Sequence, residues 1–410
     1  MDRRSFLAIL SATMMAPGMR AAGAAEEGGN EPLTICVSLG EQHLRVFEGT
    51  REVASSPISS GKAGHATPTG IFSILDKRTF HRSNIYSNAP MPFMQRLTWS
   101  GIALHASNHV PSYPASHGCV RMPDGFAREL FAITGIGAHV VISQAPVAPR
   151  RVIHRRLPDA LSPRHRLMAG GLELRLDTPG PHDEPVRVAS AADASAIASD
   201  ADPAGRRSPL RLLVTRRTDN ELTRDAQRLL NVLGFGAGTA DGFFGPVTAA
   251  ALKAFQREAG MAPTGMLARA EIDALYTAAG KGAAPTAHLY ARRDFAPLFD
   301  TPVRLDAPEM PLGAHLLTVA SISRGRARWH GLTLADRPRP SVTGSTALVA
   351  VDDTAPPAEP RDVLDRLDID AGVMDRIARD LTPGSSLAIS DNGLGPETGK
   401  GTDFIVLTRA

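Results

Sequence analysis

The run Ser116-His117-Gly118-Cys119-Val120-Arg121 contains the residue types that acyl transfer through a thiol requires. Such a reaction needs a thiolate, a base that takes its proton, donors for an oxyanion and a group that positions the substrate. A free cysteine has a pKa of about 8.5, so a neighbouring imidazole or cation must activate it at neutral pH. Cys119 is therefore the candidate nucleophile.

The residues around Cys119 could supply the remaining parts of such a site. His105 and His117 each offer an imidazole close to Cys119 in the sequence. Gly118 permits a sharp turn, so that backbone N–H groups near the thiol can point at a developing oxyanion. The guanidinium of Arg121 could hold a carboxylate in a forked ion pair.

Three other interpretations of these residues compete with acyl transfer. Both histidines could be structural, or the thiol could be a redox group, although no partner cysteine lies two or three residues away. Four residues have types that bind zinc, namely His105, His109, His117 and Cys119. Pro111 and Pro114 interrupt the segment between them, which prevents one helix from gathering these ligands. We therefore expect no metal site.

The chain has two cysteines in different contexts. Cys36 lies in the apolar run Leu33–Val37, which predicts a buried strand where cysteine behaves as a small hydrophobic residue. Cys119 follows a glycine in a polar, histidine-rich loop. This contrast favours one packed thiol and one reactive thiol over a disulfide.

The segment from about 33 to 143 resembles the L,D-transpeptidase family of the YkuD or ErfK/YbiS/YcfS/YnhG type. The family motif is a histidine, a loop, then Ser/Thr-His-Gly-Cys, an apolar residue and Arg or Asn. Supporting pieces precede it in the same order: Gln42–Phe47, Pro57–Gly61 and Thr67–Phe72. The resemblance implies a β-rich domain and cysteine–histidine acyl transfer on peptidoglycan stem peptides, with no metal and no organic cofactor.

The resemblance also implies roles for individual residues. Cys119 would be the nucleophile and His105 the general base. His117 and Gly118 would shape the oxyanion pocket, and Ser116 and Arg121 would support the loop and contact substrate. The sequence departs from the family at two points, because the loop from His105 to Cys119 is shorter than in many relatives and Ala106 stands where many have glycine.

The implied reaction forms 3-3 cross-links or attaches a protein amine, such as a lipoprotein lysine, to the wall. Water in place of the amine would make the chain an L,D-carboxypeptidase or hydrolase. A non-catalytic peptidoglycan-binding protein is the remaining alternative. Peptidoglycan biosynthesis and remodelling, and through them cell shape, are the processes that such an enzyme would serve.

The elements expected around the motif are mostly strands. Residues 33–38 and 43–47 predict a hairpin, and further strands are expected at 71–75, 102–105 and 138–143, with one helix at 125–133. We expect residues 32–144 to form a mixed sheet sandwich with one or two short helices.

The N-terminus has the features of an export signal. Arg3-Arg4 precedes a short apolar stretch, and small residues follow up to Ala25. This pattern resembles a twin-arginine signal peptide over residues 1–25. Because the apolar stretch is too short to span a bilayer and no later one is longer, we expect a periplasmic protein without a membrane span in its mature form.

The rest of the chain divides by composition into three parts. Residues 145–217 are rich in Pro, Ala and Arg and predict a partly disordered linker. Residues 218–278 have apolar residues at helical spacing, and Asp241–Gly245 together with Ala254-Phe255-Gln256 resembles a three-helix peptidoglycan-binding domain. The chain, at 410 residues with a net charge of +3 and no dense basic block, is expected to be multidomain and not to bind nucleic acid.

The last part, residues 286–410, repeats landmarks of the first. His43 to Ile58 matches His288 to Val303 at a constant offset of 245 (288 − 43 = 303 − 58). We therefore predict a degenerate, β-rich copy of the catalytic skeleton. The copy lacks the histidine–cysteine segment, so no catalytic residue is assigned to it.

Overall fold

The computed structural model describes residues 31–83, 88–160, 207–335, 358–395, 397–399 and 401–408. The predicted signal peptide and residues 161–206 of the predicted linker lie outside the described residues. No helix in the described ranges has the length and apolarity needed to cross a membrane.

The first β domain is built on a six-stranded sheet of order β18-β4-β9-β1-β2-β3. Its strands from the N-terminal part are β1 (Leu33–Ser38), β2 (His43–Glu48), β3 (Arg51–Pro57), β4 (Gly70–Ser73) and β9 (His139–Ser143). The predicted hairpin is confirmed, because β1 pairs antiparallel with β2. β9 runs parallel to β1 on its other side, and both are almost wholly buried, as expected of central strands.

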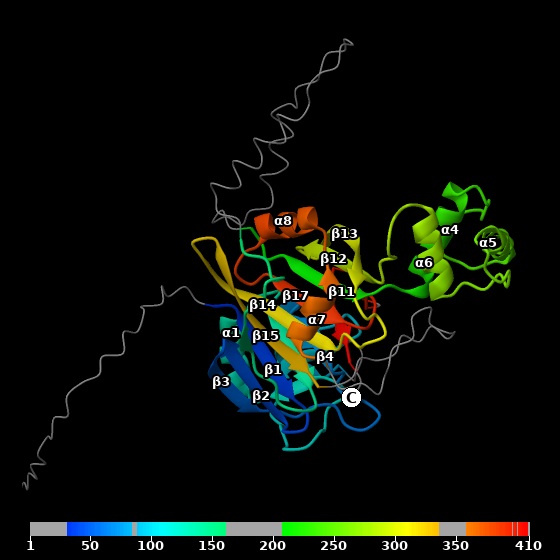
Figure 1. The fold of residues 1–410 in the computed structure, drawn as a ribbon. Coiled ribbons are helices and arrows are strands. Elements are labelled where there is room, and N and C mark those ends of the chain that lie inside the picture. The colour runs from blue at the N-terminus through cyan, green and yellow to red at the C-terminus, as the bar shows by residue number, and fades with distance from the viewer. Residues whose placement is uncertain are drawn as a thin grey trace, which may run out of the picture. The chain divides into compact units, whose positions relative to one another are not determined.

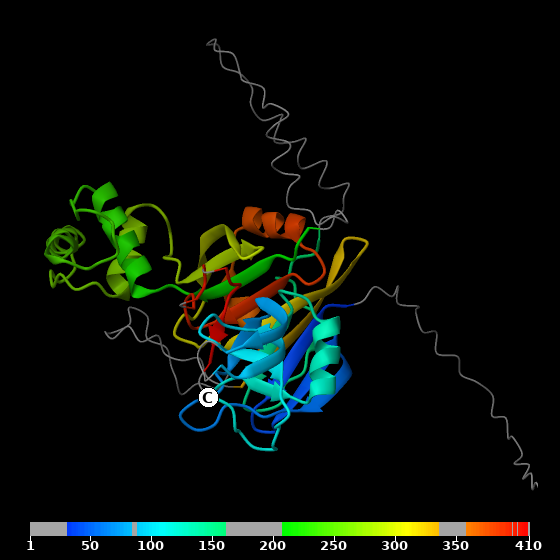
Figure 2. The ribbon, with the colours of Figure 1, turned by 180° about the vertical axis from the view of Figure 1, so that it is seen from behind.

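A smaller four-stranded sheet of order β5-β6-β7-β8 carries the residues of the motif. Its strands are β5 (Asp76–Arg82), β6 (Pro90–Arg96), β7 (Ala103–Ala106) and β8 (Val120–Met122). The predicted helix is confirmed as α1 (Asp124–Ile133), which buries Ala127 and Leu130 in a core shared with both sheets. Figure 2 shows α1 as the helix that lies along the strands of this domain. The sequence pattern predicts neither β3 nor β5, because their largely exposed residues lack apolar alternation.

The second β domain is an eight-stranded sheet of order β10-β15-β14-β17-β11-β12-β13-β16. Its strands β14, β17, β11 and β12 are labelled in Figure 1. Its strands are β10 (Arg150–Val152), β11 (Arg211–Arg216), β12 (Ala287–Arg293), β13 (Ala296–Leu305), β14 (Ala314–Ser323), β15 (Arg326–Leu334), β16 (Leu367–Asp368) and β17 (Ser386–Ser390). Two helices, α7 (Pro360–Arg366) and α8 (Ala371–Asp380), belong to it. This β-rich C-terminal region agrees with the predicted fold class.

The two β domains share their strand pairing as well as their strand order. β4-β9-β1-β2-β3 corresponds to β14-β17-β11-β12-β13, with β1 and β9, like β11 and β17, forming the parallel pair. In β2–β3 His43 faces Pro57, and in β12–β13 His288 faces Pro302, both displaced by 245 (288 − 43 = 302 − 57). The common register is strong support for the duplication that the sequence predicts.

The predicted boundaries of the linker and of the repeat need correction. Arg211–Arg216 is not linker, because it forms β11 between β12 and β17 in the middle of the second sheet. Arg150–Val152 is strand β10 as well. The repeat therefore begins near residue 211 and not at 286, and the helical unit is inserted between its first two strands. The insertion interrupts the constant offset of 245, so the sequence comparison does not reach β11.

The helical insert contains α4 (Asp219–Val232), α5 (Pro246–Glu258) and α6 (Arg269–Ala278). Thr218 and Glu221 form a capping box at the start of α4, and Pro246 occupies the first turn of α5. The three helices enclose their own apolar core, with Leu230 and Leu275 fully buried. Figure 1 shows the helices as a group joined to the ends of β11 and β12.

The two β domains exchange strands. β10, which follows the last strand of the first domain, pairs with β15 of the second sheet. β18 (Val406–Leu407), which follows the last central strand of the second domain, pairs with β4 of the first sheet. Gly70 in β4 allows this approach, because a Cβ there would lie 2.0 Å from the carbonyl oxygen of Val406. Each domain thus covers a sheet edge of the other.

Candidate active site

Parallel pairing of β7 with β8 brings the parts of the sequence motif together. His105 in β7 is the register partner of Arg121 in β8, and Cys119 immediately precedes β8. Leu104 and Val120, the neighbouring register partners, are fully buried and fix both strands in the core. The core therefore holds the histidine, the arginine and the cysteine at one end of the small sheet.

The hydroxyl group of Ser116 stabilises the turn that precedes Cys119. Ser116 is buried, and its Oγ accepts a hydrogen bond from the Gly118 N–H at 3.1 Å and donates to the Cys119 carbonyl at 2.5 Å. Gly118 has a φ of +114°, and a Cβ there would come within 3.0 Å of Ile102. Since the Gly118 amide is engaged by Ser116, glycine contributes here through the shape of the turn.

Thr67 supports the same turn from the other side, a role that sequence reasoning missed. Its Oγ1 donates to the Gly118 carbonyl and accepts from the Gly61 N–H, both at 2.8 Å. Gly61 in turn bridges to Ser116. The signal was present in the sequence, because Thr67 opens one of the supporting pieces that precede the motif in order.

His105 is held in one tautomer. Its Nδ1 lies 2.8 Å from the Ala106 carbonyl, which can only accept, so Nδ1 carries the proton and Nε2 has a free lone pair. Burial is the main cause that lowers the pKa of His105 to about 4, and the nearby charge of Arg121 acts in the same direction. His105 is therefore neutral at pH 7, as a general base must be.

The thiol of Cys119 lies against the hairpin that joins β6 to β7. Its Sγ donates to the Gly101 carbonyl at 3.2 Å, and it packs on Met91 and Met94. Burial raises the pKa of Cys119, while a backbone hydrogen bond from Ala103 and the charges of Arg96 and Arg121 oppose that rise. The resting site thus contains a neutral thiol and a neutral imidazole.

All the predicted site residues except Gly118 line one cavity of about 610 Å³. Cys119, His105, His117, Ser116 and Arg121 share its wall with Gly101, Met91, Pro92, Ser107, Asn108, His109 and Asp124. His117 is exposed, and its ring meets that of His65 edge-on at 4.8 Å. Gly101 and Met91, which sequence reasoning missed, come from the hairpin that the strand pairing brings beneath the thiol.

Two alternatives from the sequence can be compared with this geometry. In the part of the chain that the structure describes, no three His, Cys, Asp or Glu side chains are grouped as metal ligands, and this part includes His105, His109, His117 and Cys119. Cys36 and Cys119 are both free thiols. Cys36 is buried in β1, and burial raises its pKa to about 12, so the prediction of a packed thiol there is confirmed.

Comparison with known proteins places this geometry in a family. Residues 32–142 match the model of the L,D-transpeptidase catalytic domain of the YkuD type. The first β domain is an L,D-transpeptidase domain. Residues 219–275 match the model described as a putative peptidoglycan binding domain. The resemblances predicted from the sequence are thereby confirmed for both segments.

Individual relatives match the same part of the chain. A putative L,D-transpeptidase YkuD from Bacillus licheniformis is 32% identical over 117 residues, which are 27% of this chain and 66% of that protein. L,D-transpeptidase structures from Xylanimonas cellulosilytica and Stackebrandtia nassauensis are 28% and 25% identical, with TM-scores of 0.25 and 0.26. These matches cover 28% and 30% of this chain and 61% and 60% of the solved chains. The chain thus spans about two thirds or less of these relatives.

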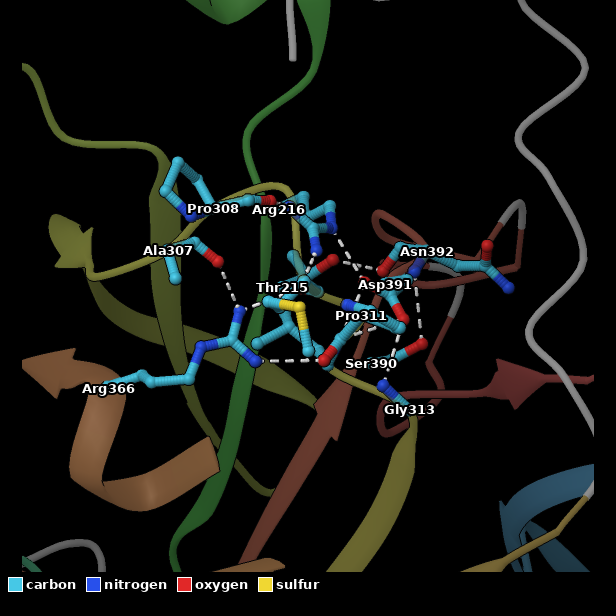
Figure 3. A network of polar contacts seen from close by, with 12 residues as sticks. Thr215, Arg216, Ala307, Pro308, Pro311, Gly313, Arg366, Ser390, Asp391 and Asn392 are labelled. Atoms are coloured by element: carbon cyan, nitrogen blue, oxygen red, sulfur yellow. Dashed lines mark hydrogen bonds and ion pairs between the residues drawn. The ribbon is translucent and has the colours of Figure 1, made fainter. Parts of the chain in front are cut away.

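The second β domain has an arginine at the place of the nucleophile. Cys119 directly precedes β8 and Arg366 directly precedes β16, at an offset of 247 (366 − 119) that also relates the starts of α8 and α1 (371 − 124). The Arg366 guanidinium donates to four backbone carbonyls, those of Asp306, Ala307, Met310 and Pro311. Figure 3 shows the guanidinium turned toward Ala307 and Pro311. Arg366 therefore anchors a loop where the first domain places its thiol.

The helical insert presents apolar side chains on two similarly built loops. Gln227 is buried and accepts from the Gly242 N–H, and the next residue, Phe243, is 70% exposed. Gln256 is buried and accepts from the Gly265 N–H, and the next residue, Met266, is 71% exposed. Since buried amides hold both loops, the exposed Phe243 and Met266 are presented on a fixed backbone.

Proposed function

We propose that the chain is an L,D-transpeptidase that works through a thioester on Cys119. The observation that carries this proposal is the placing of Cys119, His105 and Arg121 around one cavity inside the matched catalytic domain. The tautomer of His105, with its free Nε2, supplies the proton acceptor that the thiol needs. Peptidoglycan stem peptides are the substrate that the two domain types support.

The first half of the proposed reaction forms the acyl-enzyme. As Sγ of Cys119 attacks the carbonyl carbon of the third stem residue, its proton passes to Nε2 of His105. The oxyanion forms, then collapses as the bond to the terminal D-alanine breaks, and the leaving amine takes the proton from His105. The neutral resting pair means that proton transfer accompanies attack, which avoids a buried, uncompensated imidazolium in the free enzyme.

Substrate contacts follow from charge and position. Arg121 lines the cavity as a half-buried cation and can pair with a carboxylate of the stem peptide. Ser116 acts by holding the turn under Cys119. Gly118 shapes the oxyanion side of that turn, and the exposed His117 stands at its rim as the further contact predicted there.

The second half of the reaction transfers the acyl group to an amine. Attack by the side-chain amine of a neighbouring stem gives a 3-3 cross-link, and attack by a lysine of an envelope lipoprotein attaches that protein to the wall. The cavity is open enough to admit water as well, which keeps the L,D-carboxypeptidase or hydrolase alternative. The non-catalytic alternative requires Cys119 to remain unacylated by stem peptides.

The helical insert and the N-terminal sequence complete the proposal. We propose that Phe243 and its exposed neighbours hold the enzyme on peptidoglycan, because rigid apolar side chains stack on sugar and peptide surfaces. Export to the periplasm by the twin-arginine-like segment would bring the enzyme to this substrate.

The test is the muropeptide product of the purified protein. We expect incubation with disaccharide tetrapeptides to yield dimers of the mass of a 3-3 cross-link, with a thioester adduct on Cys119 in intact-protein spectra. Cys119→Ala should lose both signals while keeping its circular dichroism and wall binding. A monomeric tripeptide as sole product would identify the hydrolase, and an absent adduct would exclude cysteine catalysis.

A further inference from the structure

A carboxylate near the C-terminal end of the described chain binds the hairpin against which the nucleophile lies. Glu397 lies between β17 and β18, and it accepts two backbone hydrogen bonds from the tip of the β6–β7 hairpin. Its Oε2 is 2.7 Å from the Trp99 amide and its Oε1 is 2.9 Å from the Ser100 amide. Two charge-assisted bonds to consecutive amides fix both the position and the orientation of this tip.

The next residue along the tip is the one that holds the thiol. Gly101 has a φ of +111°, and its N–H donates to the Thr98 carbonyl at 3.3 Å. The Thr98 hydroxyl accepts from the Ile102 N–H at 3.0 Å. These bonds make the tip a tight turn, so a displacement of the Trp99 and Ser100 amides displaces the Gly101 carbonyl with them.

The same tip surrounds the sulfur of Cys119. The Gly101 carbonyl accepts the S–H bond at 3.2 Å, and Ala103 supplies a backbone hydrogen bond to the thiol from the start of β7. Arg96, whose charge also acts on the thiol, lies 5.5 Å from the Trp99 ring. The location of the sulfur therefore depends on where the tip is held.

The segment that carries Glu397 is itself anchored. The buried Thr402 donates its hydroxyl proton to the Glu397 carbonyl at 2.7 Å. Further on, Val406 pairs with Ile71 in β4, and the Thr408 hydroxyl donates to Thr69 at 2.8 Å. Glu397 is thus held by a strand that belongs to the catalytic sheet, although it follows the whole second β domain in the sequence.

We propose that Glu397 is a positioning residue for Cys119, acting through the Gly101 carbonyl to hold the sulfur for attack. Of the two expected effects, only the one on turnover rests on the proposed function. This positioning role gives the segment that follows the second β domain a part in catalysis, because this segment holds the hairpin against which the nucleophile of the first domain lies.

The test is the variant Glu397→Ala, with Glu129→Gln as the matched control. Glu129 is an exposed carboxylate on α1. Loss of the two bonds frees the tip, so Cys119 becomes more exposed and loses its S–H bond to Gly101. Both changes favour the thiolate. We expect iodoacetamide to alkylate Cys119 about tenfold faster at pH 7.5, which corresponds to a fall of roughly one unit in the pKa of the thiol.

Turnover should change in the opposite direction. A misplaced nucleophile lowers kcat, by roughly tenfold for a shift of a fraction of an ångström, while KM stays within about twofold. Glu397→Asp, which keeps the charge on a shorter side chain, should show the same directions to a smaller extent. The control Glu129→Gln should match the wild type in both measurements.

Alkylation of the buried Cys36 serves as an internal control, because it would increase only if the whole first domain became less stable. Peptide mapping should find the added label on Cys119 alone, since β1 stays closed. Label on both cysteines would make Glu397 a residue of general stability and overturn the proposal, as would unchanged alkylation and turnover. Because alkylation needs no stem peptide, a wild type that fails to cross-link would contradict the proposed function and leave this test in force.

Discussion

The two β domains place a buried histidine of similar pKa in different surroundings. His105 and His315 are both at least nine-tenths buried, and burial lowers the pKa of each to about 4. The His315 ring uses both nitrogens, since Nε2 donates to the Leu312 carbonyl and Nδ1 accepts from the Thr333 hydroxyl. His105 bonds through Nδ1 alone among the described residues, and the residue lines the cavity that Cys119 also lines.

The difference shows that burial and a shifted pKa do not by themselves identify a base. A ring whose two nitrogens are bonded within the fold stabilises structure, whereas a ring with a free lone pair beside a thiol can accept a proton. The same contrast holds for Cys119 and Arg366, which precede equivalent strands but face a cavity and a set of backbone carbonyls respectively.

We expect the largest difference in activity between substitutions of His105 and of His315. We expect His105→Gln to lower kcat/KM for stem peptides by about 10²- to 10⁴-fold, because the general base is lost. His315→Gln should keep turnover within a few-fold while lowering the thermal midpoint. Steady-state kinetics and thermal unfolding of both variants check this, and equal activity losses in the two would contradict the assignment of His105.

The pH dependence of turnover sharpens the same comparison. Activity requires neutral His105, so kcat/KM should fall as the pH drops through about 4, the pKa of His105. A histidine of ordinary pKa 6.5 would already cost roughly tenfold in rate at pH 5.5. A rate measured from pH 3.5 to 8 should therefore stay level at pH 5.5, and an acid limb centred near 6.5 would mean that His105 is not the base.

For stability we expect the opposite result: the substitution before β16 should cost more free energy of unfolding than the substitution before β8. Arg366→Ala removes hydrogen bonds to four carbonyls and should lower the free energy of unfolding by about 1–3 kcal/mol, measured by urea titration. Cys119→Ala, which removes a single thiol, should change it by less than about 1 kcal/mol. Arg366→Cys should not create a second stem-peptide adduct, since among the described residues the hydrogen-bond partners of Arg366 are backbone carbonyls and none is a histidine.

The smallest effect should concern the insert that interrupts the second domain. Phe243→Ala removes an exposed ring and should weaken binding to purified sacculi by about three- to tenfold, with turnover of soluble muropeptides unchanged. Val232→Ala is the control, because Val232 is a similarly exposed apolar residue on α4. Sacculus pull-down gives the affinity, and equal binding by Phe243→Ala and the wild type would remove Phe243 from the wall-binding surface.

The sequence predicts the elements that have a clear apolar period and the residues that form a contiguous motif. β1, β2, α1 and the three helices of the insert follow from such periods. β11 could not be found, because the long insert separates it from its partner β12 and the short apolar run stands beside an arginine-rich stretch. Residues 211–216 form a strand because they pair with distant segments of the sheet, and the local composition does not indicate that pairing.

The site shows the same division. Cys119, His105, Ser116 and Arg121 could be predicted, because one motif contains them and strand pairing keeps them together. Gly101 and Glu397 act through backbone groups and turns, which residue type does not reveal. Glu397 in particular reaches the hairpin across 298 positions of sequence.

The exchange of β10 and β18 has a consequence for how the protein is made. A nascent chain emerges from its N-terminus, so the first β domain is synthesised well before β18. Until the second domain has been translated, the edge at β4 stays open and can pair with other chains. The catalytic sheet is thus completed late in synthesis. Fragments that end after β9 should expose the unpaired edge of β4, which β18 covers in the full protein.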